Sequence, residues 1–341
     1  MTNLIIGDNR AFKFILGFAA FIIIVAGMKA SQSVIVPVLL SVFIAIISAP
    51  ALFWLENKKV PRIVAFMVVG AGVLLMLSLV GMVISSSVND FMNDLPEYQE
   101  KLHRITQSTL DLAERHNMPL SKATIIKHIN PSVLLGFSGK MIGGIGGILS
   151  NAFLIFLTVA FILFESSSFP RKLKMVSVNP DSDVDPIGKF TTNIKKYLVI
   201  KTLTSLSTGL LVVLWLYFFD VDYALLWGLI AFFLNFIPSI GSILAAIPAI
   251  LLALIQHDWK VALWVSLGYL IINSVIGNVI EPKYMGKGLG LSPLVVFLSL
   301  IFWGWVLGPV GMFLSVPLTM TAKIACDSND STKWIGVFLG P

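Results

Sequence analysis

The sequence predicts an all-α polytopic integral membrane protein, with about six full transmembrane helices, two re-entrant or broken helical hairpins and a small extracytoplasmic helical segment. Of its 341 residues, 57% are hydrophobic and 12% are charged, whereas an ordinary soluble domain has roughly 45–50% and about 25%. Charge-free runs recur along the chain at about the 20 residues that cross a bilayer. Two of these runs are interrupted by proline and glycine, which predicts broken helices.

The expected membrane segments follow one another along nearly the whole chain. Lys13 and Lys29 flank the first and shortest run. Lys29 stands where a signal-peptide cleavage site would need a small residue, so we expect this run to be a span. The expected segments are 14–28, 30–55, 63–89, 141–164, 202–219, 223–256, 261–280 and 288–322.

These segments divide the chain into four parts. Residues 1–88 form three N-terminal transmembrane helices, 89–140 an extracytoplasmic amphipathic helical segment, 141–325 a C-terminal transport core with broken helices, and 326–341 a cytoplasmic tail. In the second part, apolar residues recur at spacings of four and three, as in a coiled coil. This helix is expected to pack on another helix of the chain or on a neighbouring subunit; its apolar positions are Phe91, Leu95, Tyr98, Leu102, Ile105 and Leu112.

The charges of the loops predict the topology, because Lys and Arg collect on the cytoplasmic side of short loops. Lys58, Lys59 and Arg62 place the loop after the second span inside, so the first two spans should form an in–out–in hairpin with a cytoplasmic N-terminus. The same rule makes segment 223–256 leave from the outside and return to it. Only about 17 residues are then available for each leg, the lower limit for a crossing. A re-entrant hairpin or two half-helices fits this segment better.

Proline and glycine mark the two interruptions. Pro238 removes a backbone donor and Gly241 permits a tight reversal in the first. Gly308, Pro309 and Gly311 do the same in the second, which enters from the opposite face. Paired interruptions of this kind are the best sequence pointer to a substrate site near the midplane of a transporter. We therefore expect these five residues to lie on the substrate path.

Polar residues at membrane depth are the next candidates for that path. Lys201 begins a polar stretch that continues with Thr202 and Ser205. Its amine either snorkels to the cytoplasmic headgroups or acts as a cation inside a cavity. Asn235, at the first interruption, is either a helix-end residue or a solute ligand.

Four further polar residues lie in or at the ends of the expected spans. Asn273 and Asn278 are five positions apart, so on an α-helix they face different directions, and they serve either hydrogen bonds between helices or the solute. Glu281, before a proline, is either a solvated helix end or a gate or proton-accepting carboxylate. The same two interpretations apply to Glu165.

Other classes of protein are disfavoured by missing patterns. The sequence contains no H-E-x-x-H, no G-x-S-x-G and no Walker loop, so we expect neither an enzyme nor ATP-driven transport, and no cofactor. The single cysteine, Cys326, excludes an internal disulfide framework and a cysteine metal cluster, and no metal site is expected. The net charge of +6 is interpreted as a topology signal and not as a nucleic-acid surface.

A stripe of small residues predicts close helix packing. Gly139, Gly143 and Gly147 repeat every four residues on one face of a helix. Together with the extracytoplasmic amphipathic helix, this stripe predicts a homo-oligomer.

Four stretches carry a resemblance to a known family. They are GKGLGLSPLVVFLSLIFWGWVLGPVGMFLSVPLT, ALLWGLIAFFLNFIPSIGSILAAIP, NVIEPKYMGKGLGLS and KYLVIKTLTSLSTG, and they resemble the autoinducer-2 exporter family from the first span to about Lys323. The resemblance implies a multi-pass protein of the bacterial inner membrane that exports a small quorum-sensing signal and affects biofilm formation. It also implies homo-oligomers, with a pentamer as one form. Some members resemble sodium or lithium/proton antiporters.

Three functional hypotheses follow. The first is a secondary transporter that exports a small polar signalling molecule, autoinducer-2, because few charges lie within the apolar runs and a neutral solute needs hydrogen bonds more than counter-ions. The second is a Na⁺(Li⁺)/H⁺ antiporter, which would use Glu281 or Glu165. The third is a non-transporting membrane scaffold, which explains the amphipathic helix but not the two interruptions. The expected partners are the lipid bilayer, a small polar solute and copies of the same chain.

Overall fold

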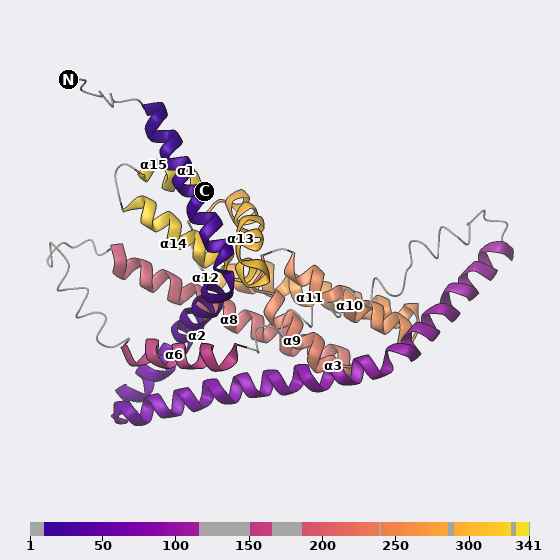
Figure 1. Ribbon diagram of the computed structural model, residues 1–341. Coiled ribbons are helices and arrows are strands. Elements are labelled where there is room, and N and C mark those ends of the chain that lie inside the picture. Colours follow the sequence, from indigo (N-terminus) through magenta and orange to yellow (C-terminus); the bar gives the residue numbers. More distant parts are fainter. Residues whose placement is uncertain are drawn as a thin grey trace, which may run out of the picture.

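The computed structural model describes residues 10–115, 151–165, 186–238, 240–285, 290–328 and 332–340, and every regular element in these ranges is a helix (Figure 1). The elements are α1 (Arg10–Ala30), α2 (Gln32–Asn57), α3 (Arg62–Arg115), α6 (Ala152–Glu165), α8 (Pro186–Phe218), α9 (Ala224–Leu234), α10 (Gly241–Gln256), α11 (Trp259–Asn273), the π-helix η1 (Ser274–Ile280), α12 (Glu281–Met285), α13 (Pro293–Phe313), α14 (Ser315–Asp327) and α15 (Lys333–Leu339). The predicted stripe Gly139, Gly143 and Gly147 lies outside the described residues.

The predicted all-α polytopic membrane fold is confirmed. Within the described ranges, five helical stretches are long and apolar enough to cross a membrane, and shorter apolar helices accompany them. Their outward faces are apolar, as α8 illustrates: Leu203 and Leu210 are exposed, whereas Lys201, Ser205 and Thr208 are buried on the opposite face. The exposed apolar face of such a helix suits contact with lipid hydrocarbon, and its buried polar face suits the interior of the protein.

One expectation about the topology is wrong. The first two spans do not form an antiparallel hairpin, because helical hydrogen bonds continue through Ser31, the one residue between α1 and α2. Its N–H donates to the carbonyl of Gly27 at 2.9 Å, and its own carbonyl accepts from Ile35 at 3.0 Å. A single residue that keeps these bonds bends the chain without reversing it, so α2 follows α1 in a new direction (Figure 1). The stacked rings of Phe21 and Phe302, 6.2 Å apart, place α1 along α13.

Helix α3 is far longer than a bilayer requires. Its 54 residues span about 81 Å at 1.5 Å per residue. Phe91 and Tyr98 are buried, and Phe91 packs edge-on against Tyr223 at 5.8 Å and Trp227 at 6.3 Å between ring centroids. The first positions of the amphipathic segment therefore pack on another helix of the same chain, as expected. The side chains of Leu102 and the later apolar positions lie outside the description.

Helices α9 and α10 form a hairpin whose two ends meet. The N–H of Asp222, before α9, donates to the side-chain oxygen of Gln256 at 3.1 Å. In the hairpin, α9 has 11 residues and α10 has 16, about 16 and 24 Å, each shorter than the roughly 30 Å of hydrocarbon. The segment thus returns to the end from which it started. Whether this hairpin enters and leaves the membrane at the same face is not tested, so its re-entrant topology stays a prediction.

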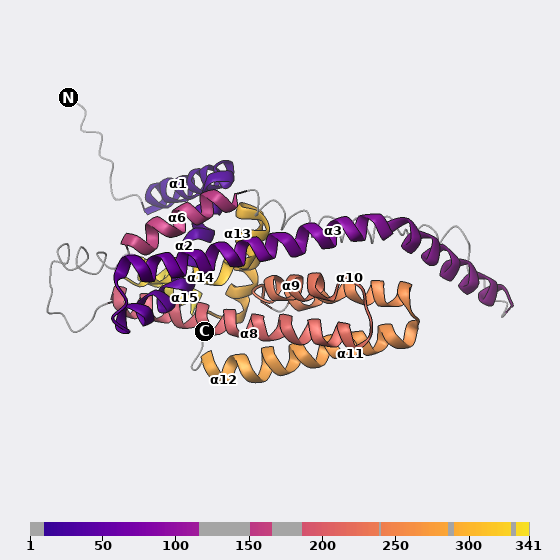
Figure 2. The ribbon, with the colours of Figure 1, turned by 90° about the horizontal axis from the view of Figure 1, so that it is seen from below.

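The mouth of this hairpin is attached to α3. Tyr98 donates to Asp222 at 2.8 Å, and Tyr223 donates to Asp94. Figure 2 shows α8, α9, α10 and α11 lying together beside α3.

Helices α13 and α14 form the second hairpin. Gly308 has φ 68° and ψ −154°, which breaks α13 at the predicted Gly-Pro step. Such a positive φ is open to glycine and strained for other residues. The indole N–H of Trp303 donates to the hydroxyl of Thr319 at 2.9 Å and joins the two legs.

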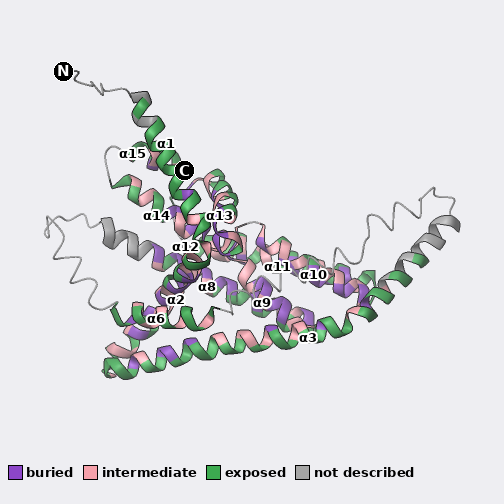
Figure 3. Cartoon of the chain, viewed as in Figure 1, coloured by how far each residue is buried: buried purple, intermediate pink, exposed green. Residues whose placement is uncertain are grey.

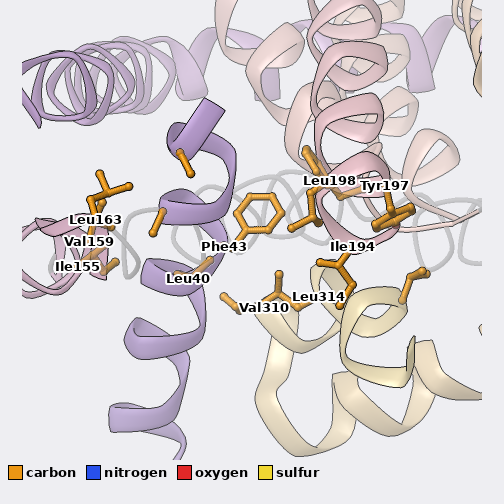
Figure 4. Close-up of a cluster of buried hydrophobic side chains, with 14 of the residues drawn as sticks. Leu40, Phe43, Ile155, Val159, Leu163, Ile194, Tyr197, Leu198, Val310 and Leu314 are labelled. Carbon is orange, nitrogen blue, oxygen red and sulfur yellow. The ribbon is translucent and has the colours of Figure 1, made fainter. Parts of the chain in front are cut away.

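Three phenylalanines connect the two hairpins at the centre of the molecule. Phe236 follows α9 and Phe313 ends α13, and their ring centroids are 4.3 Å apart. Phe43 of α2 packs edge-on against both, at 5.6 and 4.8 Å. Figure 4 shows Phe43 between α8 and the α13–α14 turn, and Figure 3 shows that burial is greatest in this central region. The two predicted interruptions are therefore neighbours in space.

Candidate transport cavity

A cavity of about 650 Å³ opens beside the first break. Its wall is formed by α8, by the α9–α10 turn, by α10 and by the continuous stretch from α11 through η1 to α12, with one residue each from α13 and α14. The polar residues of the wall are Tyr197, Lys201, Asn235, Ser242, Ser266, Tyr269, Asn273, Ser274, Asn278 and Glu281.

Lys201 and Glu281 form a buried ion pair on this wall. The ammonium nitrogen lies 2.8 Å from each carboxylate oxygen, and the two side chains are 7% and 16% exposed. The interpretations of Lys201 as a snorkelling side chain and of Glu281 as a solvated helix end are therefore wrong. Lys201 lies on the inward face of α8, where the helix start at Glu281 supplies the opposite charge that a buried ammonium requires.

The side chains of the described cavity wall carry no net charge in total. Among the described residues of its wall, Lys201 and Glu281 alone carry a formal charge, and they neutralise each other. The remaining polar groups are hydroxyls and amides. This chemistry suits hydrogen bonding to an uncharged molecule better than binding an isolated ion.

The π-helix brings Asn273 and Asn278 to the same wall. We expected residues five apart to face different directions, because an α-helix places them about 140° apart. That expectation is wrong here: the i→i+5 hydrogen bonds of a π-helix bring such residues nearly into line. The amide nitrogen of Asn273 donates to the carbonyl of Tyr269, 2.8 Å away in its own helix, instead of bridging two helices. π-Helical turns are frequent at functional sites.

Asn235 is a helix-end residue, and it also lies on the cavity wall, so its role as a solute ligand stays a prediction. It is the C-cap residue of α9, with its N–H donating to Ala231 at 2.9 Å. Its side chain lies on the cavity wall and donates to the hydroxyl of Ser205 at 3.0 Å. Ser205 is completely buried behind the wall, so it orients Asn235 and does not face the cavity itself.

Several other candidates do not line the cavity. At the first break, Pro238 lines the cavity, whereas Gly241 lies in the turn behind it. Thr202 faces away and donates to the carbonyl of Leu198 at 2.7 Å, and Glu165, at the end of α6, is also absent from the wall. For Thr202 the reason is the 100° step between consecutive helix residues, which separates it from Lys201.

The second break also lies outside the cavity wall, contrary to our expectation of one path lined by both. Gly308, Pro309 and Gly311 do not line it, and the second hairpin reaches it through Val296 and Val316 alone. The aromatic rings of Phe236 and Phe313 fill the space between the two breaks.

Sequence reasoning missed Tyr269 as a wall residue. It lies in a repeat of polar or small residues at intervals of four: Tyr269, Asn273, Gly277 and Glu281, all on the cavity wall. This spacing, within a run of Leu, Ile and Val, was the available signal.

These features define a multi-pass membrane protein with a neutral polar cavity next to a broken helical hairpin. The chain belongs to the AI-2E transporter family, whose model, described as AI-2E family transporter, matches residues 18–329. The chain is 41% identical over 334 residues to a putative transport protein of Haemophilus influenzae, with 96% of each chain covered. It is 38% identical over 327 residues to the AI-2 transport protein TqsA of Escherichia coli, covering 96% of this chain and 95% of the relative. It is 34% identical over 334 residues to the putative transport protein YhhT of the same species, covering 98% and 96%.

Proposed function

We propose that the protein is a secondary transporter of the bacterial inner membrane that exports a small, neutral, hydroxyl-rich signalling molecule, autoinducer-2. The observation that carries this proposal is the cavity beside the first break, where the two charged residues of the described wall neutralise each other. Two further facts support it: membership of a transporter family, and the name of the relative TqsA, an AI-2 transport protein.

The size and lining of the cavity suit a small solute. Its volume of about 650 Å³ lies within the roughly 300–1,000 Å³ of small-molecule sites. Apolar residues of α10, among them Ile243, Ala246 and Ile250, line the cavity together with hydroxyls and amides from the other elements. A neutral polyol can use such groups without the cost of burying an unpaired charge.

Transport also requires the solute to reach both faces of the membrane. In transporters with broken helices, one repeat or bundle moves against the other around a fixed site. The α9–α10 hairpin forms one side of the cavity and the α11–η1–α12 stretch forms another. We propose that movement between these two elements exposes the solute alternately.

The direct test is efflux of labelled autoinducer-2 from proteoliposomes, with and without proton or sodium gradients. Asn235→Leu removes a donor and an acceptor but keeps a similar bulk. We expect efflux per folded protein to fall roughly tenfold, the equivalent of about 1.4 kcal/mol.

The matched control is Thr202→Val, which alters a hydroxyl outside the cavity and should leave efflux unchanged. Wild-type protein that releases no labelled signal under any gradient would contradict the proposal. If Asn235→Leu reduces the amount of folded protein and leaves efflux per folded protein intact, Asn235 acts as a helix cap and not as a solute ligand.

A second candidate function is Na⁺(Li⁺)/H⁺ antiport, favoured by the carboxylate of Glu281 inside the cavity. An antiporter needs a titratable group on its path, and Glu281 is the acidic residue of the described wall. Inverted vesicles with a pH-sensitive dye distinguish the two functions. A pH change on addition of sodium or lithium that Glu281→Gln abolishes would establish antiport, whereas its absence in wild-type vesicles would exclude it.

We also propose that the protein forms a homo-oligomer. Beyond its contacts with α9, the described outer part of α3 is largely exposed (Figure 3). We propose that a second copy of the chain packs on this exposed part, which includes Met92. Mass measurement in mild detergent should detect oligomers, and a monomer at every concentration would contradict the proposal.

A further inference from the structure

Two buried polar atoms on the cavity wall have no hydrogen-bond partner within the described part of the chain. They are the phenolic oxygen of Tyr269 and the side-chain oxygen of Asn273. We infer that they form a subsite for two adjacent hydroxyl groups of a neutral solute, with Tyr269 as donor and Asn273 as acceptor. The inference rests on the proposed function and specifies the chemistry of its substrate.

The positions of the two residues support a common subsite. They are four residues apart, at the end of α11, and therefore share one face of the helix. The amide nitrogen of Asn273 already donates to the carbonyl of Tyr269 at 2.8 Å. This bond holds the amide, so its oxygen is the end that remains for a ligand.

Several of the other polar groups on the wall are already paired. Ser266, on the same face, donates to the carbonyl of Ala262 at 2.7 Å. Lys201 and Glu281 bind each other, and the amide nitrogen of Asn235 donates to Ser205. Tyr269 and Asn273 are thus the wall residues with hydrogen-bonding capacity left unused in buried atoms.

The next position on this face leaves room for the body of a solute. Gly277 lies four residues beyond Asn273 on the wall, and a Cβ added there would meet no atom within 4 Å. Glu281 follows after four more residues, held by Lys201. The open space therefore lies on the same wall as the polar pair, four residues beyond Asn273.

The chemistry of the pair favours a diol. A hydroxyl group both donates and accepts, so adjacent hydroxyls can accept from the phenol and donate to the amide oxygen. A carboxylate could accept from the phenol but would meet a second acceptor at Asn273. Leaving both atoms unpaired is costly in a buried position, and a bound diol would remove that cost.

The test is equilibrium binding of labelled autoinducer-2 to the purified full-length protein in detergent. Tyr269→Phe removes the hydroxyl and little else. We expect the Kd to rise roughly tenfold, about 1.4 kcal/mol. For an analogue that lacks the hydroxyl that accepts from Tyr269, wild type and Tyr269→Phe should bind equally.

Ser266→Ala is the matched control, because its hydroxyl lies on the same wall but is already paired; its Kd should not change. The melting temperature of Tyr269→Phe should stay at or above that of wild type, since the deleted group has no partner in the protein. A melting temperature that falls, with unchanged Kd, would assign Tyr269 a structural role and overturn the subsite.

Two other results would also overturn it. The first is an equal rise in Kd for the diol and the deoxy analogue. The second is a sodium dependence of binding that Tyr269→Phe abolishes, which would make the pair a cation site. In both cases wild-type binding persists and the proposed function stands, whereas wild-type protein that neither binds nor releases autoinducer-2 contradicts the proposed function itself.

Discussion

The two helical breaks use the same backbone device. At the first, a Cβ on Gly241 would lie 1.8 Å from the carbonyl oxygen of Leu234. At the second, a Cβ on Gly311 would lie 2.0 Å from the carbonyl oxygen of Trp303. In each case a half-helix folds back so closely on the preceding one that a side chain has no space. The chain thus makes the same reversal twice.

The surroundings of the two breaks differ. Asn235 follows the first half-helix and faces a polar cavity, whereas Phe313 and Leu314 occupy the second break and are packed against other apolar side chains. Broken backbone does not by itself create a polar cavity. The side chains of the elements opposite, above all Lys201 and Glu281, make the first break polar.

The largest expected effect tests the shared device. Gly241→Ala and Gly311→Ala should each remove most of the folded protein, because the added atom meets a backbone oxygen that cannot move as a side chain can. The cost should exceed the roughly 1–3 kcal/mol of ordinary over-packing. Fluorescence-detected size-exclusion chromatography measures the folded fraction. Gly72→Ala in α3 is the control, because nothing lies within 4 Å of its Cβ; a stable Gly311→Ala would show that the two breaks are not equivalent.

The next effect tests the charges that distinguish the first break. Lys201→Met leaves Glu281 buried without a partner, which should lower the free energy of unfolding by about 3–5 kcal/mol. Lys201→Met/Glu281→Gln should recover most of that stability in thermal melts. Recovery of both stability and efflux by the double variant would mean that the ion pair has a purely structural role.

A smaller effect tests how far the breaks depend on each other. The rings of Phe236 and Phe313 are 4.3 Å apart, and aromatic pairs contribute about 0.5–1.5 kcal/mol beyond their buried area. A double-mutant cycle with Phe236→Leu and Phe313→Leu should show a coupling energy of that size in the free energy of unfolding. Additive single effects would indicate that the two breaks are energetically independent.

The smallest effect concerns a buried hydroxyl at the second break. Ser315 is completely buried, and its oxygen has no partner among the described residues. Ser315→Ala removes an unpaired polar group, so the melting temperature should stay constant or rise slightly. Efflux should stay at the wild-type rate, since Ser315 is not on the cavity wall. A clear loss of efflux would extend the solute path to the second break.

The sequence by itself determined the membrane class and the positions of the breaks. Spanning segments appear as apolar runs in the sequence. Proline and glycine affect the backbone within a few residues of their own positions, as at Pro238, Gly241, Gly308 and Pro309. Both signals are local, so they can be found from the sequence alone. It also revealed the amphipathic start of the long helix α3, because a helical period is a local property.

Tertiary structure alone decided which polar residues meet. Lys201 and Glu281 are 80 positions apart and pair only because α8 packs against the start of α12. Asn273 and Asn278 share a wall because the helix widens to a π-helix, and Thr202 is excluded by its direction on α8. Which polar side chains pair in a buried site depends on how distant helices pack and on which face of each helix points inward. The spacing of residues along one segment predicts neither of these.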